Sequence, residues 1–271
     1  MKRFLRDLGV FLGVFGLLFH AYPEFQYWTK RYQKDVAGTE VYEVISASKS
    51  KLTKKKLVIG DSVAKQVLDS LANDSTLVSL ASNQAISMAG QYLIASKALA
   101  ANPSLDTLVL MYHPFSFQNN LASPLSFHYF VKPFYTDENR ALFSREVKQQ
   151  VEAIPFYYLA HYRPVLTSNW SPSFEGVSDE KGLFSSISRD YVSKLQQLCS
   201  KNGVVLQIIS PPINEIYKSR LMASRAQFKS LQGFVESWHF YAKSNFLPDQ
   251  IHLVRFDFLA SSPWKRARLI R

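Results

Sequence analysis

The apolar positions of this chain follow two periodicities in turn. Short, nearly continuous apolar runs are typical of buried strands, and we expect strands at residues 56–60, 75–81, 106–112 and 204–210. Other segments repeat apolar residues at the three- and four-residue spacing of amphipathic helices, at residues 62–73, 87–103, 188–203 and 213–238. The last of these segments is long enough for one helix or a pair of helices.

Strands that alternate with helices in this order predict an α/β fold. Strands that are apolar along their whole length are typical of a parallel sheet with helices on both faces. We therefore expect a three-layer α/β/α sandwich with a mainly parallel central sheet. The active crevice of such sheets lies at the carboxyl ends of the strands, so the residues directly after each strand are the first candidates for a site.

A long segment interrupts this alternation between the third strand and the next helix. Residues 113–187 are rich in aromatic side chains and contain one charged helical stretch, residues 137–153. Such a length exceeds that of a plain connection. The segment is either a subdomain or lid over the edge of the sheet, or an aromatic packing layer without a substrate role, and the sequence leaves both open.

The N-terminal residues 1–25 combine a basic start with an uncharged apolar stretch of roughly 15 residues, short of the roughly 20 that a bilayer-spanning helix needs. No small-residue cleavage site follows, and Tyr22, Tyr27 and Trp28 are typical of interfacial aromatics. We expect an uncleaved, single-pass signal anchor, with Lys2, Arg3 and Arg6 in the cytoplasm. The rest of the chain would then be extracytoplasmic, in the cell envelope. The alternative is a buried amphipathic helix of a soluble protein.

The composition of the chain limits the classes of binding partner that we expect. With 271 residues, 47% hydrophobic and 20% charged, the chain is long and apolar enough for a folded domain. Its net charge of +11 fits nucleic acid, an anionic membrane or an acidic polymer. Two basic clusters flank the apolar N-terminal stretch and no nucleic-acid motif accompanies them, so we expect a membrane partner and no nucleic acid. The single cysteine, Cys199, and the histidine spacing predict no metal site and no cofactor.

The candidate chemistry begins at Gly60-Asp61-Ser62, which directly follows the first predicted strand. A serine hydroxyl becomes a nucleophile when a base, usually histidine, takes its proton, and a carboxylate usually orients that base. Among six histidines, His252 has Asp249 three residues before it, a spacing that brings carboxylate and imidazole together in a tight turn. The alternative is an ordinary connection between a strand and a helix, in which Gly60 permits a sharp turn and Ser62 does not react.

The two motifs together resemble those of the SGNH (GDSL-type) hydrolases and acyltransferases. A G-D-S triplet after a buried strand is followed about 190 residues later by D-x-x-H, and the resemblance covers residues 54 to 258. It implies a flavodoxin-like sandwich over residues 54–271 with an insertion at 113–187, preceded by a linker at 26–53. It also implies that Ser62 is the nucleophile, His252 the general base and Asp249 its orienting partner.

The remaining motifs of that family are less well matched. The family has an oxyanion-hole glycine after the second strand, where this chain has Gln84, whose backbone N–H could still donate. The family also has an asparagine after the third strand, and Asn120 is the nearest counterpart. The oxyanion hole implied by the resemblance is therefore Ser62, Gln84 and Asn120. His113 and Ser116 follow the third strand and are candidate substrate-binding residues.

The function that we expect is acyl transfer through an acyl-serine intermediate. The resemblance implies a membrane-anchored enzyme that hydrolyses an ester or transfers an acetyl or other acyl group on a cell-envelope glycan, in some members beside a multipass membrane acyltransferase. One alternative is a non-catalytic envelope module that binds a glycan or a membrane partner on the same scaffold. A nucleotide-binding domain is disfavoured because no G-x-G-x-x-G or G-x-x-x-x-G-K-[ST] motif is present.

Overall fold

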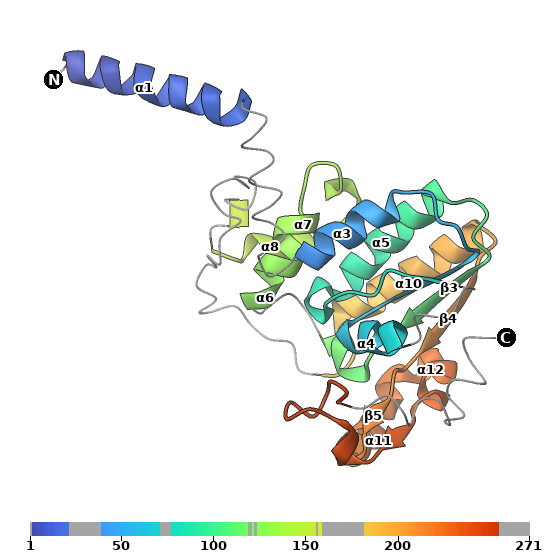
Figure 1. Cartoon of the computed structure of the whole chain (residues 1–271). Helices are drawn as coiled ribbons and strands as arrows, with labels where there is room; N and C mark the ends of the chain where they lie inside the picture. Colours follow the sequence, from blue (N-terminus) through green and yellow to red (C-terminus); the bar gives the residue numbers. More distant parts are fainter. Residues whose placement is uncertain are drawn as a thin grey trace.

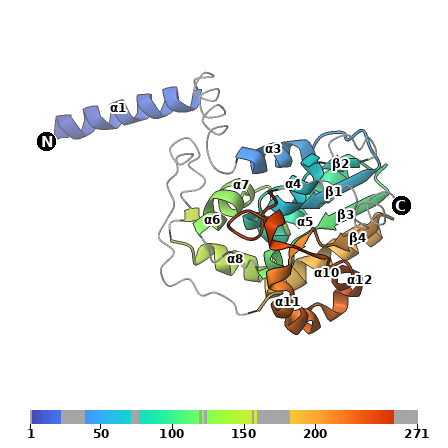
Figure 2. The same ribbon diagram turned by 60° about the horizontal axis from the view of Figure 1, so that its bottom comes forward.

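A computed structural model of the chain describes residues 2–21, 39–70, 77–118, 121, 124–155, 157–158 and 182–254. Its centre is a parallel sheet of four strands in the order β2-β1-β3-β4 (Figures 1 and 2). The strands are β1 (Lys56–Gly60), β2 (Leu77–Ser79), β3 (Thr107–Met111) and β4 (Val205–Ile209). Each strand lies within an apolar run of the sequence, and helices cover both sides of the sheet. The predicted α/β class with a mainly parallel sheet is confirmed.

Both faces of the central strands β1 and β3 are buried, which explains why these two strands are apolar along most of their length. In β1, Leu57 and Ile59 contribute to one core cluster and Val58 to the other. The first cluster lies beneath α3 (Thr39–Ser48), α5 (Ser87–Ala101) and α10 (Ser186–Lys201), and the second lies beneath α4 (Ser62–Ser70). Because successive strand residues point to opposite faces, a strand covered on both faces, such as β1 or β3, needs apolar side chains at successive positions.

Helices α5 and α10 begin and end close to the positions that the sequence predicts. The Ser185 hydroxyl accepts a hydrogen bond from the N–H of Ser188 and caps the start of α10. Gly203, with a φ of +66°, follows the end of that helix, where a left-handed residue is favourable. Helix α5 ends at Ala101, two residues before Pro103. Local signals therefore set these boundaries.

The described part of the long aromatic segment extends the core of the sheet. It contains η2 (Pro114–Gln118), α6 (Pro124–Ser126), the π-helical turn η3 (Phe127–Val131), α7 (Lys132–Phe134), η4 (Arg140–Leu142) and α8 (Arg145–Glu152). Phe127, Phe130, Phe134 and Phe143 are buried in the same cluster as α5 and the sheet. In this part the aromatic residues form a packing layer. Residues 119–120, 122–123, 156 and 159–181 of the segment lie outside the described residues.

The segment after β4 differs from the one or two helices that the sequence predicts. It starts with β5 (Ile213–Asn214), which pairs in parallel with β6 (Phe240–Tyr241). Between these strands lie η6 (Glu215–Tyr217), α11 (Lys218–Ser224), η7 (Arg225–Leu231) and α12 (Gln232–Glu236), and η8 (Lys243–Asn245) follows β6. The Asn214 side chain accepts from the N–H of Ile216, and Phe228 leaves the helical conformation, which together break the segment into short helices.

At the N-terminus, α1 (Lys2–Ala21) lies apart from the α/β body in both views (Figures 1 and 2). Among the residues that the structure describes, no helix has both the length and the apolar content needed to cross a membrane. This finding differs from the predicted transmembrane helix. Within the predicted linker, α3 belongs to the domain, because its Val41 is buried in the main core.

Candidate active site

The site begins with a glycine that the packing of the sheet requires. A Cβ atom at Gly60 would overlap the carbonyl oxygen of Met111 on the neighbouring strand and would also approach Ala64 at 2.7 Å. The carbonyl of Gly60 accepts a hydrogen bond of 2.8 Å from Nε2 of Gln91. Glycine at this position therefore permits β1, β3 and α4 to approach closely. The sequence analysis explained Gly60 by a sharp turn and did not predict this close packing.

Asp61 joins the ends of two strands. Its Oδ1 accepts from the backbone N–H groups of Val63 and Ala64, both at 3.1 Å, and so caps α4. Its Oδ2 accepts from the N–H of His113 and from the hydroxyl of Ser116, both at 2.6 Å. The side chain is fully buried, and burial raises the pKa of the Asp61 carboxyl while the four donors oppose that rise. Asp61 thus shapes the turn beneath Ser62.

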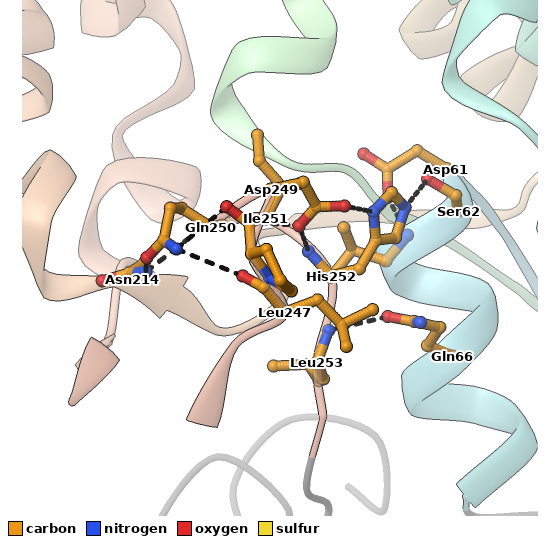
Figure 3. Close-up of polar contacts among 12 residues, drawn as sticks. Asp61, Ser62, Gln66, Asn214, Leu247, Asp249, Gln250, Ile251, His252 and Leu253 are labelled. Carbon is orange, nitrogen blue, oxygen red and sulfur yellow. Dashed lines mark hydrogen bonds and ion pairs between the residues drawn. The ribbon is translucent and has the colours of Figure 1, made fainter. Parts of the chain in front are cut away.

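Ser62, His252 and Asp249 form a continuous chain of hydrogen bonds (Figure 3). Oγ of Ser62 lies 2.9 Å from Nε2 of His252, and Nδ1 of the same ring lies 2.6 Å from Oδ2 of Asp249. An ionised carboxylate only accepts, so Nδ1 carries the hydrogen and Nε2 presents its lone pair to the serine O–H. The structure thus brings together the three residues that the sequence motifs pair.

The turn from Asp249 to His252 is organised by the carboxylate itself. Oδ1 of Asp249 accepts from the N–H groups of Ile251 at 2.9 Å and of His252 at 3.0 Å. Burial acts to raise the pKa of Asp249, but these bonds and the bond from the imidazole outweigh it and hold the pKa below its usual range. Asp249 is therefore ionised at neutral pH, as a partner for the Nδ1–H group must be.

Two polar residues that the sequence did not single out hold this turn in place. Asn214 is fully buried on β5, and its Nδ2 donates to the carbonyl of Gln250 at 3.3 Å and to its Oε1 at 3.1 Å (Figure 3). Gln250 has a φ of +64°, a conformation unusual for a residue other than glycine. Oε1 of Gln66 accepts from the N–H of Leu253 at 2.9 Å, so the helix that begins at Ser62 also supports the residue after His252.

A signal for one of these two residues was present in the sequence. Gln66 lies four residues after Ser62 on a predicted helix, which places both on one face. Asn214 carried no such signal, because its role depends on the parallel pairing of β5 with β6.

The other candidate site residues divide into three groups. The N–H of Ser82 donates to the carbonyl of Gly60 at 2.9 Å, which brings the following segment to this edge of the sheet. Gln84 begins η1 (Gln84–Ile86) in that segment, and its backbone alone is described. His113 and Ser116 are buried beside Asp61. Asn120 lies outside the described residues.

Within the described part of the chain, no group of three or more His, Cys, Asp and Glu side chains is arranged to hold a metal ion. Comparisons with models of protein families, with curated proteins and with solved structures found no match to this chain.

Proposed function

We propose that this chain is a serine acyl-transfer enzyme of the SGNH type that cleaves an ester through an acyl intermediate on Ser62. The observation that carries the proposal is the hydrogen-bonded chain from Oγ of Ser62 through His252 to Asp249, with distances of 2.9 Å and 2.6 Å. These are the nucleophile, base and orienting acid of a serine triad. An ordinary connection between a strand and a helix has no need for a histidine and a carboxylate from a turn almost 190 residues away.

The geometry supports a balanced two-step reaction. Oγ of Ser62 attacks the ester carbonyl carbon while its proton moves to Nε2 of His252, and a tetrahedral oxyanion forms. The oxyanion collapses, the bond to the alkoxy group breaks, and the imidazolium gives its proton to the leaving alcohol. Water or a sugar hydroxyl then attacks the acyl-serine, again giving its proton to His252, which returns it to Ser62. Asp249 keeps the Nδ1–H group and stabilises the imidazolium throughout.

Part of the oxyanion stabilisation comes from the position of Ser62. It is the first residue of α4, and the N-terminus of a helix carries partial positive charge. The N–H groups of Val63 and Ala64 are already bonded to Asp61, so the helix contributes its field and not these donors. Donors that are aimed at a developing oxyanion are each worth roughly 10²- to 10³-fold in rate. The G-D-S turn thus supplies the nucleophile and a favourable field from the same short segment.

Location and substrate follow from the resemblance and from α1. We propose a three-layer sandwich attached to a membrane by its N-terminal helix, with the domain outside the cytoplasm and a cell-envelope glycan as acyl donor or acceptor. Its support is that apolar side chains of α1 are uncovered, with Leu17 71% and Phe11 63% exposed. Membranes from cells that make the full chain should release it with detergent and retain it in high salt. Release by salt alone would contradict the anchor.

The proposed activity is tested by covalent labelling. The full chain, in mild detergent, is exposed to a fluorophosphonate probe beside Ser62→Ala and Ser193→Ala, the latter an exposed serine on α10. We expect the parent and Ser193→Ala to be labelled and Ser62→Ala to remain unlabelled. Equal labelling of the parent and both variants, or labelling of none of them, would contradict the proposal. Either result would favour the non-catalytic module that binds a glycan or a partner.

The same triad serves hydrolysis and transfer. The two are separated by following the acyl-enzyme formed from p-nitrophenyl acetate in the presence and absence of an oligosaccharide. Faster loss of the acyl group with a matching acetylated sugar as product indicates a transferase. A rate independent of sugar indicates a hydrolase.

A further inference from the structure

We infer that His113 is a further catalytic residue, whose Nε2–H group donates a hydrogen bond to the oxyanion that forms at Ser62. This inference rests on the proposed function and deepens it. It starts from a buried donor that has no acceptor in the described part of the chain.

The backbone places His113 beside the nucleophile. Strands β1 and β3 are paired in register, with Gly60 opposite Met111. Ser62 and His113 therefore each follow a paired strand end by two residues, at the same edge of the sheet. The 2.6 Å hydrogen bond from the N–H of His113 to Oδ2 of Asp61 holds the two connections together. The connection that carries His113 therefore lies beside the one that carries Ser62.

The hydrogen bonds of the ring fix its tautomer. Nδ1 of His113 accepts a hydrogen bond of 3.3 Å from the N–H of Phe115, which requires a lone pair on Nδ1. The hydrogen of the neutral ring is therefore on Nε2. That Nε2 atom is buried and has no hydrogen-bond partner among the described residues. An orphaned buried donor is destabilising, and an oxyanion formed beside it would supply the missing acceptor.

The charge state suits a donor and not a second base. His113 is 1% exposed, and burial, with a smaller contribution from the charge of His252, lowers its pKa to about 3. The ring is thus neutral at pH 7, and its Nε2–H group donates a hydrogen bond without giving up its proton. The contribution from His252 agrees with two imidazoles at the same edge of the sheet. A neutral imidazole of lowered pKa is an established way to polarise a carbonyl oxygen.

Two neighbouring hydroxyls are weaker candidates. The hydroxyl hydrogen of Ser116 is directed at Asp61 over 2.6 Å, so it supports the turn. The hydroxyl of Tyr112 is buried without a described partner, but its ring packs edge to face on Phe117, in the core cluster beneath α5. Ser62 begins the helix that covers the opposite face of the sheet. Tyr112 therefore offers a matched control for His113.

The test compares His113→Leu, His113→Gln and Tyr112→Phe with the parent, all as full chains. One measurement is kcat/KM for a p-nitrophenyl ester. The other is the affinity for a boronic acid, whose tetrahedral adduct on Ser62 has an oxygen where the oxyanion forms. We expect His113→Leu to lose about 10²- to 10³-fold in both, because one oxyanion donor is removed. His113→Gln, which keeps an N–H group, should recover part of the loss, and Tyr112→Phe should match the parent.

The outcomes separate this inference from the proposed function. If the parent is labelled at Ser62 but folded His113→Leu keeps the rate and the boronic acid affinity of the parent, the inference is wrong and the triad stands. If the parent is not labelled by the fluorophosphonate probe, the proposed function and the inference on His113 are both wrong. If His113→Leu does not fold, the parent is produced with ¹⁵N-enriched histidine and studied by NMR. The Nε2 resonance of His113 should then shift when the boronic acid binds. An unchanged resonance would overturn the inference.

Discussion

Two turns face each other across the site, and both are built on an aspartate that accepts from the N–H groups two and three residues later. Asp61 does so at the start of α4, and Asp249 does so at the turn that carries His252. The surroundings differ. Asp61 is fully buried, whereas the side chains of Asp249 and His252 are 48% and 30% exposed.

The Oδ2 atoms of the two aspartates have different partners, in keeping with the difference in burial. In Asp61 it accepts from His113 and Ser116 and ties two strands of the sheet together. In Asp249 it faces the imidazole of His252. The same local hydrogen-bonding pattern thus serves the architecture at one turn and the proposed chemistry at the other. Burial and the third partner of each carboxylate distinguish the two roles.

The strongest test of this comparison is Asp249→Asn. The amide can no longer hold the Nδ1–H tautomer as a carboxylate does, so we expect the rate of ester cleavage to fall by about 10³- to 10⁴-fold. Stability should change by less than about 1 kcal/mol, because the side chain is about half exposed and the amide oxygen of asparagine can still accept from the two backbone N–H groups. Initial rates and urea denaturation measure the two effects. Activity within tenfold of the parent would remove Asp249 from the mechanism.

The same substitution at the other turn should act in the opposite way. In Asp61→Asn, one of the two oxygens becomes an NH₂ group that meets buried donors instead of accepting from them. We expect a loss of about 2–4 kcal/mol in the free energy of unfolding, since buried donors are left unsatisfied. The urea midpoint of the purified variant measures it. Unchanged stability combined with lost activity would assign Asp61 to the chemistry.

The buried imidazole of His113, beside the first turn, should make the stability of the fold depend on pH. The pKa of His113 is lowered from 6.5 to about 3, so between these values the unfolded chain binds a proton that the folded chain does not. Stability therefore rises with pH through this window and is lost as pH falls below 6.5, by up to about 1.4 kcal/mol per pH unit. His113→Gln should reduce the loss between pH 7 and pH 5 by about 2 kcal/mol, measured by urea denaturation. Identical slopes in parent and variant would contradict a neutral, buried His113.

The smallest effect is expected where the two turns are joined. Gln66→Ala removes the acceptor for the N–H of Leu253 and loosens the contact between α4 and the His252 turn. One lost hydrogen bond of about 1 kcal/mol corresponds to a decrease of roughly fivefold in the rate of fluorophosphonate labelling. Gln197→Ala on α10 is the control and should label at the parental rate. Equal rates for both variants would mean that the turn needs no support from α4.

Much of this arrangement follows from short-range patterns in the chain. Apolar runs and helical periodicity predict the bounds of β1, β3, β4, α4, α5 and α10 within a few residues. The reason is that the pattern of apolar residues within a segment reflects which of its faces is buried. The G-D-S and D-x-x-H motifs likewise name Ser62, Asp249 and His252, since a capping carboxylate and its turn are local.

Other features depend on residues that are distant in sequence. The packing of Gly60 against Met111, the bonds from Asp61 to the connection after β3, and the support of Gln250 by Asn214 join segments that are 36 or more residues apart. No local pattern encodes which buried polar groups will meet. The orphaned Nε2 of His113 is of the same kind, because a donor is unpartnered only with respect to everything that packs around it. Local composition therefore predicts the elements and the motifs, while three-dimensional packing selects the partners that turn a serine and a histidine into a site.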